Sequence, residues 1–185
     1  MNTNHDSGKF TAPGEVTFVR LLPGPIERVW AFLTDSDKRG RWLAAGPMEV
    51  RVGGEVRMHF HHADLTPHRE EIPAKYKESC GEGSAACDFT GRVTRCEPPR
   101  HLAFTWGENS EVTFELTPKD DQILFVLTHR RLGDDPEVLG SVAAGWHTHL
   151  AILLARLAGE VPPPFWSTHF GHEAAYARTI VKGAP

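Results

Sequence analysis

The chain has 185 residues, of which 40% are hydrophobic and 24% charged, and its formal net charge is -4. This length and composition suffice for the core of one domain and exclude disorder of the whole chain. Basic residues are scattered among acidic ones, so we expect neither nucleic acid nor a membrane as a partner. The polar residues 1–10 lack the apolar core of a signal peptide, and we therefore expect a cytoplasmic protein.

The first elements predicted along the chain are one strand and two short helices. Glu15–Leu22 is a predicted strand, and Pro23–Pro25 ends it, with the last proline suited to the opening turn of a helix. Asp35 and Ser36 then offer an N-cap for a second short helix over Asp37–Trp42. Two helices directly after one strand indicate an α+β fold and not alternating βαβ units.

From Met48 onward the pattern is that of a sequential antiparallel sheet. Met48–Val52 and Glu55–Phe60 alternate with period two around Gly53-Gly54, a pair that supplies the positive φ angles of a tight hairpin turn. Further strands are predicted between turn sequences. They span Phe89–Cys96, His101–Trp106, Glu111–Leu116 and Gln122–Arg130.

Two long segments complete the expected organisation. The polar stretch between His62 and Ala86 is too long for a hairpin loop, and is either a mobile cover over one mouth of the fold or a disordered connection. Apolar spacings of three and four predict a long helix through Gly145–Leu157, and a last short helix over Thr168–Ile180 is expected to pack back on the body. We therefore expect a flexible tail at residues 1–13, one domain at 14–159 and a packed extension at 160–185.

The cysteines and histidines raise the question of a metal site. Cys80, Cys87 and Cys96 form an odd set without a Cys-x-x-Cys pair, which is typical neither of a disulfide framework nor of structural zinc. The histidines cluster in two places but lack the His-Glu-x-x-His spacing. These clusters are His59, His61 and His62, and His147 with His149. We expect no metal and no cofactor.

Short motifs accompany this order of elements along residues 15–157. They are Pro25-Ile-Glu-Arg-Val-Trp30, Trp42, Val52-Gly-Gly54, Gly91-Arg-Val93 followed by Pro98-Pro99, Leu102-Ala-Phe-Thr-Trp106, Val112-Thr-Phe-Glu-Leu116, Leu127-Thr-His129 and Gly145-Trp-His147. Their order resembles the START and Bet v 1-like (SRPBCC) superfamily, and within it bacterial proteins related to the C-terminal domain of the activator of Hsp90 ATPase. The resemblance implies an α+β helix-grip fold. In that fold, a curved antiparallel sheet of six to seven strands wraps around a long C-terminal helix, and two short helices follow the first strand.

The resemblance leaves several functions open. Members of the superfamily hold lipids, polyketides, hormones or aromatic compounds in a cavity between sheet and helix, some catalyse reactions there, and the eukaryotic namesake contacts a chaperone. Our leading hypothesis is a cytoplasmic binding protein for a small hydrophobic or aromatic molecule. A polyketide cyclase or lyase using the same cavity is the second, and a module that binds a protein partner such as a chaperone is the third and least favoured. A homodimer is left open.

Period-two alternation of the strands defines the candidate ligand site on the inner face of the sheet. The expected site residues are Met58, Phe60, Phe104, Trp106, Phe114, Phe125, Leu127, His129, Trp146, His149, Leu150 and Leu153. Such side chains either line a pocket or fill the space as core. His129 is either a polar handle for the ligand or a structural histidine. The sequence shows no nucleophile paired with a base, and we assign no catalytic residue.

Overall fold

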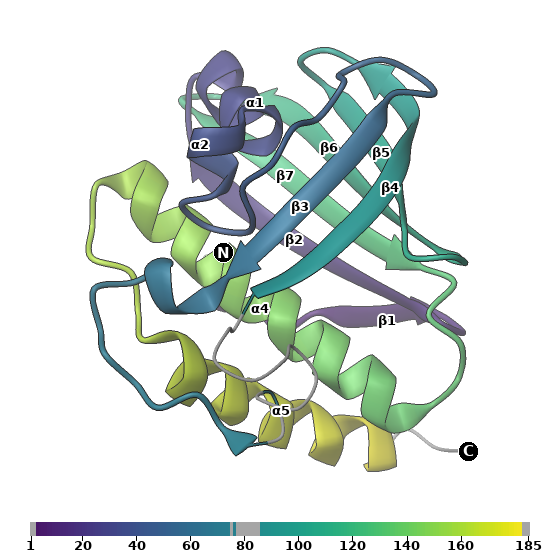
Figure 1. Ribbon diagram of the computed structural model, residues 1–185, viewed down its shortest axis with the longest axis vertical. Coiled ribbons are helices and arrows are strands. Elements are labelled where there is room, and N and C mark those ends of the chain that lie inside the picture. Colours follow the sequence, from purple (N-terminus) through teal and green to yellow (C-terminus); the bar gives the residue numbers. More distant parts are fainter. Residues whose placement is uncertain (1–2, 75, 77–85, 183–185) are drawn as a thin grey trace.

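The computed structural model describes residues 3–74, 76 and 86–182 (Figure 1). Seven strands form one antiparallel sheet in the order β1-β2-β7-β6-β5-β4-β3. The strands are β1 (Lys9–Ala12), β2 (Glu15–Pro23), β3 (Glu55–His61), β4 (Ala86–Glu97), β5 (His101–Trp106), β6 (Ser110–Lys119) and β7 (Gln122–Arg130). From β3 to β7 each strand pairs with the next, whereas β2 pairs with β7. The predicted helix-grip fold is confirmed.

The N-terminal residues expected as a flexible tail contribute the edge strand β1. A 3-10 turn, η1 (Thr3–His5), precedes it, and the Asn4 side chain makes two hydrogen bonds to the backbone of Leu21, at 2.9 and 2.7 Å. The backbone N–H of Gly8 donates to the hydroxyl of Tyr176 at 2.6 Å. These contacts with distant residues hold the segment against the fold, so its order does not depend on a pattern within residues 1–13.

Two short helices lead away from β2 and fix the position of Trp42. Asp35 is the one residue between α1 (Ile26–Thr34) and α2 (Ser36–Arg39). Its carboxylate accepts a hydrogen bond from the backbone N–H of Lys38 at 3.0 Å, which caps α2. Helix α2 ends at Arg39, before the predicted end at Trp42. The indole N–H of Trp42 donates to the carbonyl of Phe32 at 2.8 Å, and the Trp42 ring is 0% exposed.

The predicted hairpin around Gly53-Gly54 is wrong in its first strand. Met48–Val52 is irregular and makes one isolated bridge to β3, at Met48. Gly53 has a φ of +81° and donates its backbone N–H to the carbonyl of Val93 in β4 at 2.8 Å. Val50 and Val52 are 37% and 63% exposed, so the two valines of the segment form no buried face that would hold it in the sheet.

Two long helices lie together beside the sheet. In Figure 1, α4 (Pro136–Ala158) crosses the face of the sheet and α5 (Phe165–Lys182) runs along α4. Among the described residues, α4 is the one helix long and apolar enough to span a membrane by length and composition. However, 61% of its most apolar window is buried, as in the core helix of a soluble protein.

The segment after β3 reaches the start of α5. It begins with η2 (His62–Asp64), and further on the Glu70 carboxylate accepts the backbone N–H groups of Trp166 and Ser167 at 2.8 and 3.0 Å. This cap explains why α5 begins at Phe165, before the predicted Thr168. The alternatives of a lid and a disordered connection concerned residues 63–85, of which 75 and 77–85 lie outside the described residues.

Candidate functional site

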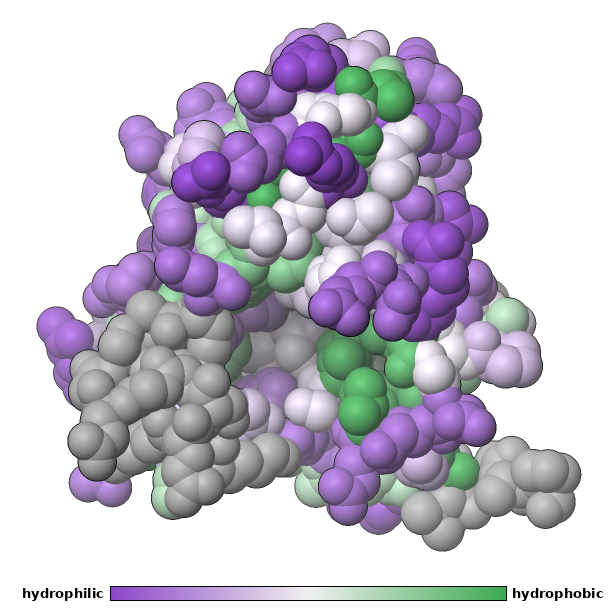
Figure 2. Space-filling model, turned by 45° about the vertical axis from the view of Figure 1, so that its right-hand side comes forward, coloured by the Kyte–Doolittle hydropathy of each residue, from purple (hydrophilic) through white to green (hydrophobic). Residues whose placement is uncertain are grey.

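A pocket of about 330 Å³ opens between α4 and one end of the sheet. Figure 2 shows that the surface on one side of the molecule is hollowed, with hydrophobic side chains gathered beside the hollow. The pocket walls combine apolar side chains, aromatic rings and three imidazoles. They are formed by Leu43, Phe60, His62, Phe89, Trp106, His129, Val142, Gly145, Trp146 and His149.

The expected site residues divide into two groups. Five of them line the pocket: Phe60, Trp106, His129, Trp146 and His149. The others are 0% exposed and pack beneath it: Met58, Phe104, Phe114, Phe125, Leu127, Leu150 and Leu153. The inner face of the sheet thus combines a filled core with a pocket at one end, because α4 closes over the central part of the strands.

Part of the pocket wall was missed by the sequence analysis. Val142 and Gly145 precede Trp146 and His149 at helical spacings, so they lie on the same face of α4, and the period of the helix could have identified them. Phe89 stacks on Trp106 with ring centroids 4.7 Å apart. The remaining wall residues, in η2 and in the loop after α2, follow no period.

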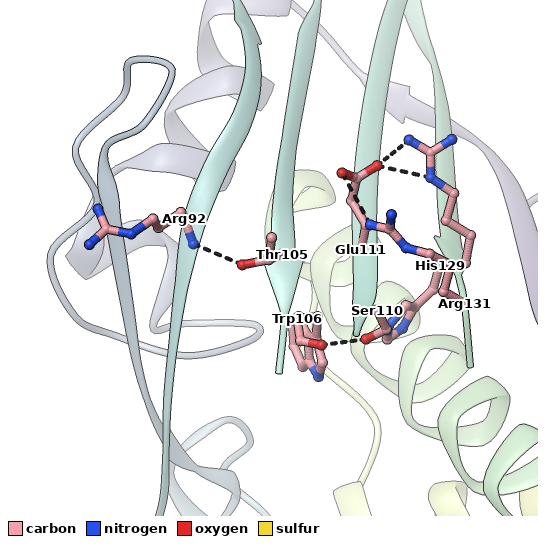
Figure 3. Close-up of polar contacts among 8 residues, drawn as sticks. Arg92, Thr105, Trp106, Ser110, Glu111, His129 and Arg131 are labelled. Atoms are coloured by element: carbon pink, nitrogen blue, oxygen red, sulfur yellow. Dashed lines mark hydrogen bonds and ion pairs between the residues drawn. The ribbon is translucent and has the colours of Figure 1, made fainter. Parts of the chain in front are cut away.

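His129 lies within a chain of hydrogen bonds that joins α4 to the sheet. The indole N–H of Trp146 donates to Nδ1 of His129 at 2.9 Å, so a neutral His129 carries its proton on Nε2. That nitrogen lies 3.0 Å from Oγ of Ser110, whose hydroxyl donates to the carbonyl of Trp106 (Figure 3). Both ring nitrogens of His129 are therefore engaged within the protein.

The environment of His129 keeps its ring uncharged. The side chain is 1% exposed, and burial lowers its pKa to about 4. A neutral imidazole with one donating and one accepting nitrogen matches its two partners, Ser110 and Trp146. This geometry is that of a structural histidine.

Within the described residues, His149 forms a hydrogen bond through one ring nitrogen, whereas His129 uses both. Its Nδ1 lies 2.7 Å from the carbonyl oxygen of Trp42. Since a carbonyl only accepts, Nδ1 carries the proton and Nε2 keeps its lone pair. Burial, followed by the charge of His62, lowers the pKa of His149 to about 3, so the ring stays neutral at physiological pH.

The His62 ring joins the pocket to α5. Its centroid lies 4.4 Å from that of Phe165 and 5.5 Å from those of His149 and Trp166. It also stacks on Phe60 of β3, with centroids 5.7 Å apart. The C-terminal extension therefore supports one wall of the pocket through aromatic contacts.

An ionic cluster lies on the outer face of the sheet. The Glu111 carboxylate accepts hydrogen bonds from the guanidinium of Arg130 and lies 3.5 Å from that of Arg131 (Figure 3). Burial raises the pKa of Glu111, but the hydrogen bonds from Arg130 and Thr94 and both arginine charges outweigh burial and lower it. Glu111 is not among the residues that line the pocket between α4 and the sheet.

The described residues contain no group of three or more His, Cys, Asp or Glu that could hold a metal ion. Cys96 has a free thiol. Cys80 and the side chain of Cys87 lie outside what the structure describes.

Comparisons with known proteins identify the fold family. The family model described as "Activator of Hsp90 ATPase homolog 1-like protein" matches residues 23–158. No curated protein matches the chain significantly. The solution NMR structure of the protein encoded by gene BPP1335 from Bordetella parapertussis is 44% identical, with a TM-score of 0.74 over 95% of this chain and 94% of that one.

Two further solved structures share the fold. The crystal structure of CalU16 from Micromonospora echinospora is 22% identical, with a TM-score of 0.63 and coverage of 94% of each chain. DynU16, whose description places it in the dynemicin biosynthetic locus, is 20% identical, with a TM-score of 0.61 over 82% of this chain and 49% of that one. At these identities the similarity concerns the fold alone.

Proposed function

The chain belongs to the family of Activator of Hsp90 ATPase homolog 1-like proteins, and we propose that it binds a small hydrophobic or aromatic molecule. The observation that supports this function is the pocket of about 330 Å³ between α4 and the sheet. Small-molecule sites are concave and mainly apolar, with a few polar groups and volumes of about 300–1,000 Å³. All of the pocket walls lie within the matched residues 23–158.

The aromatic rings of the pocket favour a flat ligand. Trp106 is at their centre, with ring centroids 4.7 Å from Phe89, 5.2 Å from Trp146 and 5.9 Å from Phe60. Aromatic pairs in such arrangements contribute about 0.5–1.5 kcal/mol beyond the burial of their area. A planar ring inserted among them would be stabilised both by the burial of its area and by the aromatic contacts. We therefore propose that the ligand contains one or two rings.

The polar groups of the pocket favour an uncharged ligand. The pKa values of His129 and His149 are lowered to about 4 and about 3, so both rings are neutral at pH 7. Among the described residues, the side chains that line the pocket include no Asp, Glu, Lys or Arg. An ion placed there would lose its hydration without gaining a partner of opposite charge. The desolvation of a buried ion costs on the order of several kcal/mol.

Mass spectrometry and mutation together test this function. The protein would be purified from its own host and examined under native conditions, and any bound molecule would be extracted and identified. We expect a stoichiometric small molecule that is lost from Trp106→Ala. The matched control is Trp30→Ala, which removes an indole from α1 outside the pocket and should keep the ligand. An empty protein that also fails to bind a panel of aromatic compounds would contradict the proposal.

The alternative functions lack comparable support in the described residues. A cyclase or lyase would use the same pocket and needs a group that moves a proton. Both nitrogens of His129 already have partners within the protein, and the pKa of His149 is lowered to about 3, which makes its ring a weak base. A module that binds a chaperone or a second copy would act through its surface. The partner-binding alternative does not explain why aromatic side chains surround an open pocket.

A further inference from the structure

We infer that the ligand of this pocket donates a hydrogen bond to Nε2 of His149, and is therefore an uncharged aromatic molecule with a ring hydroxyl or N–H group. The inference rests on the proposed binding function, because it requires that a ligand occupies the pocket. It adds the chemical group by which the ligand is recognised. No such group follows from the aromatic walls alone.

The protein fixes the tautomer of His149. The carbonyl of Trp42 accepts the proton of Nδ1 at 2.7 Å. Trp42 is in turn held by its own indole N–H, which donates to the carbonyl of Phe32 at 2.8 Å. Because this carbonyl cannot donate, the ring presents Nε2 as an acceptor and not as a donor.

Nε2 of His149 is available to a ligand in the pocket. His149 is 6% exposed and lines the pocket. Its Nε2 makes no hydrogen bond within the described part of the chain. This nitrogen is also not one of the fully buried polar atoms without a partner. The atom is therefore accessible from the pocket. An acceptor in such a site loses free energy when an apolar ligand expels its water, and regains it when the ligand supplies a donor.

The polar groups of Trp146 and His129 are already engaged. Trp146 uses its indole N–H on His129, and the other nitrogen of His129 faces Ser110. A ligand that bonded to either would first have to break the chain between α4 and the sheet. Of Trp146, His129 and His149, only His149 offers an acceptor without that cost.

The test compares three probes of similar shape by isothermal titration calorimetry: 2-naphthol, 2-methoxynaphthalene and naphthalene. The first can donate a hydrogen bond, the second carries the same oxygen without the proton, and the third has no polar group. We expect the wild-type protein to bind 2-naphthol about tenfold or more tightly than 2-methoxynaphthalene. This comparison is decisive even if a variant fails to fold.

Variants assign the preference to one nitrogen. In His149→Asn the amide N–H₂ can still donate to Trp42, but no acceptor remains at the position of Nε2. The preference should fall below about twofold while naphthalene affinity is kept. His149→Gln places an amide oxygen near Nε2 and should restore part of the preference. His147→Asn is the matched control, because His147 lies on the same helix and contacts Tyr176 outside the pocket.

Each result separates the inference from the function on which it rests. Equal affinities of the wild-type protein for all three probes would overturn the role of His149 and leave the binding function in place. A preference for 2-naphthol that persists in His149→Asn would also overturn it. Failure of the wild-type protein to bind any of the probes would overturn the inference by removing the proposed function.

Discussion

Lowering the pH from 7 to 5 should destabilise this protein strongly, because three buried imidazoles resist protonation. Burial is the main cause that lowers the pKa of His129 to about 4 and the pKa values of His147 and His149 to about 3. In the unfolded chain a histidine has a pKa of about 6.5. Between these values the unfolded chain takes up protons that the folded protein does not, so the free energy of unfolding decreases as the pH falls.

The size of the effect follows from these pKa values. At pH 5 each of the three histidines lowers the free energy of unfolding by about 2 kcal/mol relative to pH 7, and together by about 6 kcal/mol if they act independently. Domains of this kind are stable by about 5–15 kcal/mol in total. The loss would therefore leave the protein marginally stable or unfolded. The lowered pKa values of Glu70 and Glu111 add a further loss of stability only at lower pH.

Urea denaturation at pH 7, 6 and 5, followed by circular dichroism, measures this dependence. Near pH 5 the slope of the free energy with pH should correspond to an uptake of about three protons or more on unfolding, because the pKa values of His101 and His172 are lowered as well. Replacing His147 by Phe should remove about one proton from that uptake. Equal free energies of unfolding at pH 7 and pH 5 would refute the conclusion that these rings are kept neutral by the fold.

Three substitutions test other contacts. Trp146→Phe removes the donor to His129 and should cost about 1–3 kcal/mol of unfolding free energy, measured with urea, because a buried acceptor is left unpaired. Glu70→Gln weakens the cap of α5 and should cost about 1 kcal/mol; an unchanged thermal midpoint would contradict this role. Gly54→Ala places a methyl group 2.2 Å from a backbone oxygen. This overpacking should cost about 1–3 kcal/mol and lower the thermal midpoint of unfolding. The control is Gly145→Ala, because the added methyl group would meet open space.

Parts of the fold could be predicted closely because local and distant constraints agree. The bounds of β5 and β7 match the predictions His101–Trp106 and Gln122–Arg130, since both strands alternate toward the core and end at turn sequences. Met48–Val52 alternates equally well, but its two valines are exposed. Lys9–Ala12 shows no pattern of its own, and its order depends on residues far along the chain.

The site was harder to predict because ring orientation depends on distant partners. Strand alternation correctly placed His129 toward α4, but it could not show that Trp146 and Ser110 would occupy both of its nitrogens. The proton position of His149 is set by the carbonyl of Trp42, which comes from the loop after α2. His62 reaches the pocket from η2, whose position follows no hydrophobic period.

The pairing of β2 with β7 has a consequence for the way the protein is made. Val16 near the start of the chain is the register partner of His129, so one edge of β2 stays unsatisfied until most of the domain has left the ribosome. The apolar side of β2 is exposed to other chains during that interval. Pairings of such high sequence separation close late and slowly, and they are the stage at which nascent chains aggregate. Overproduction of this protein should therefore benefit from slower translation or from chaperones that shield the N-terminal strand.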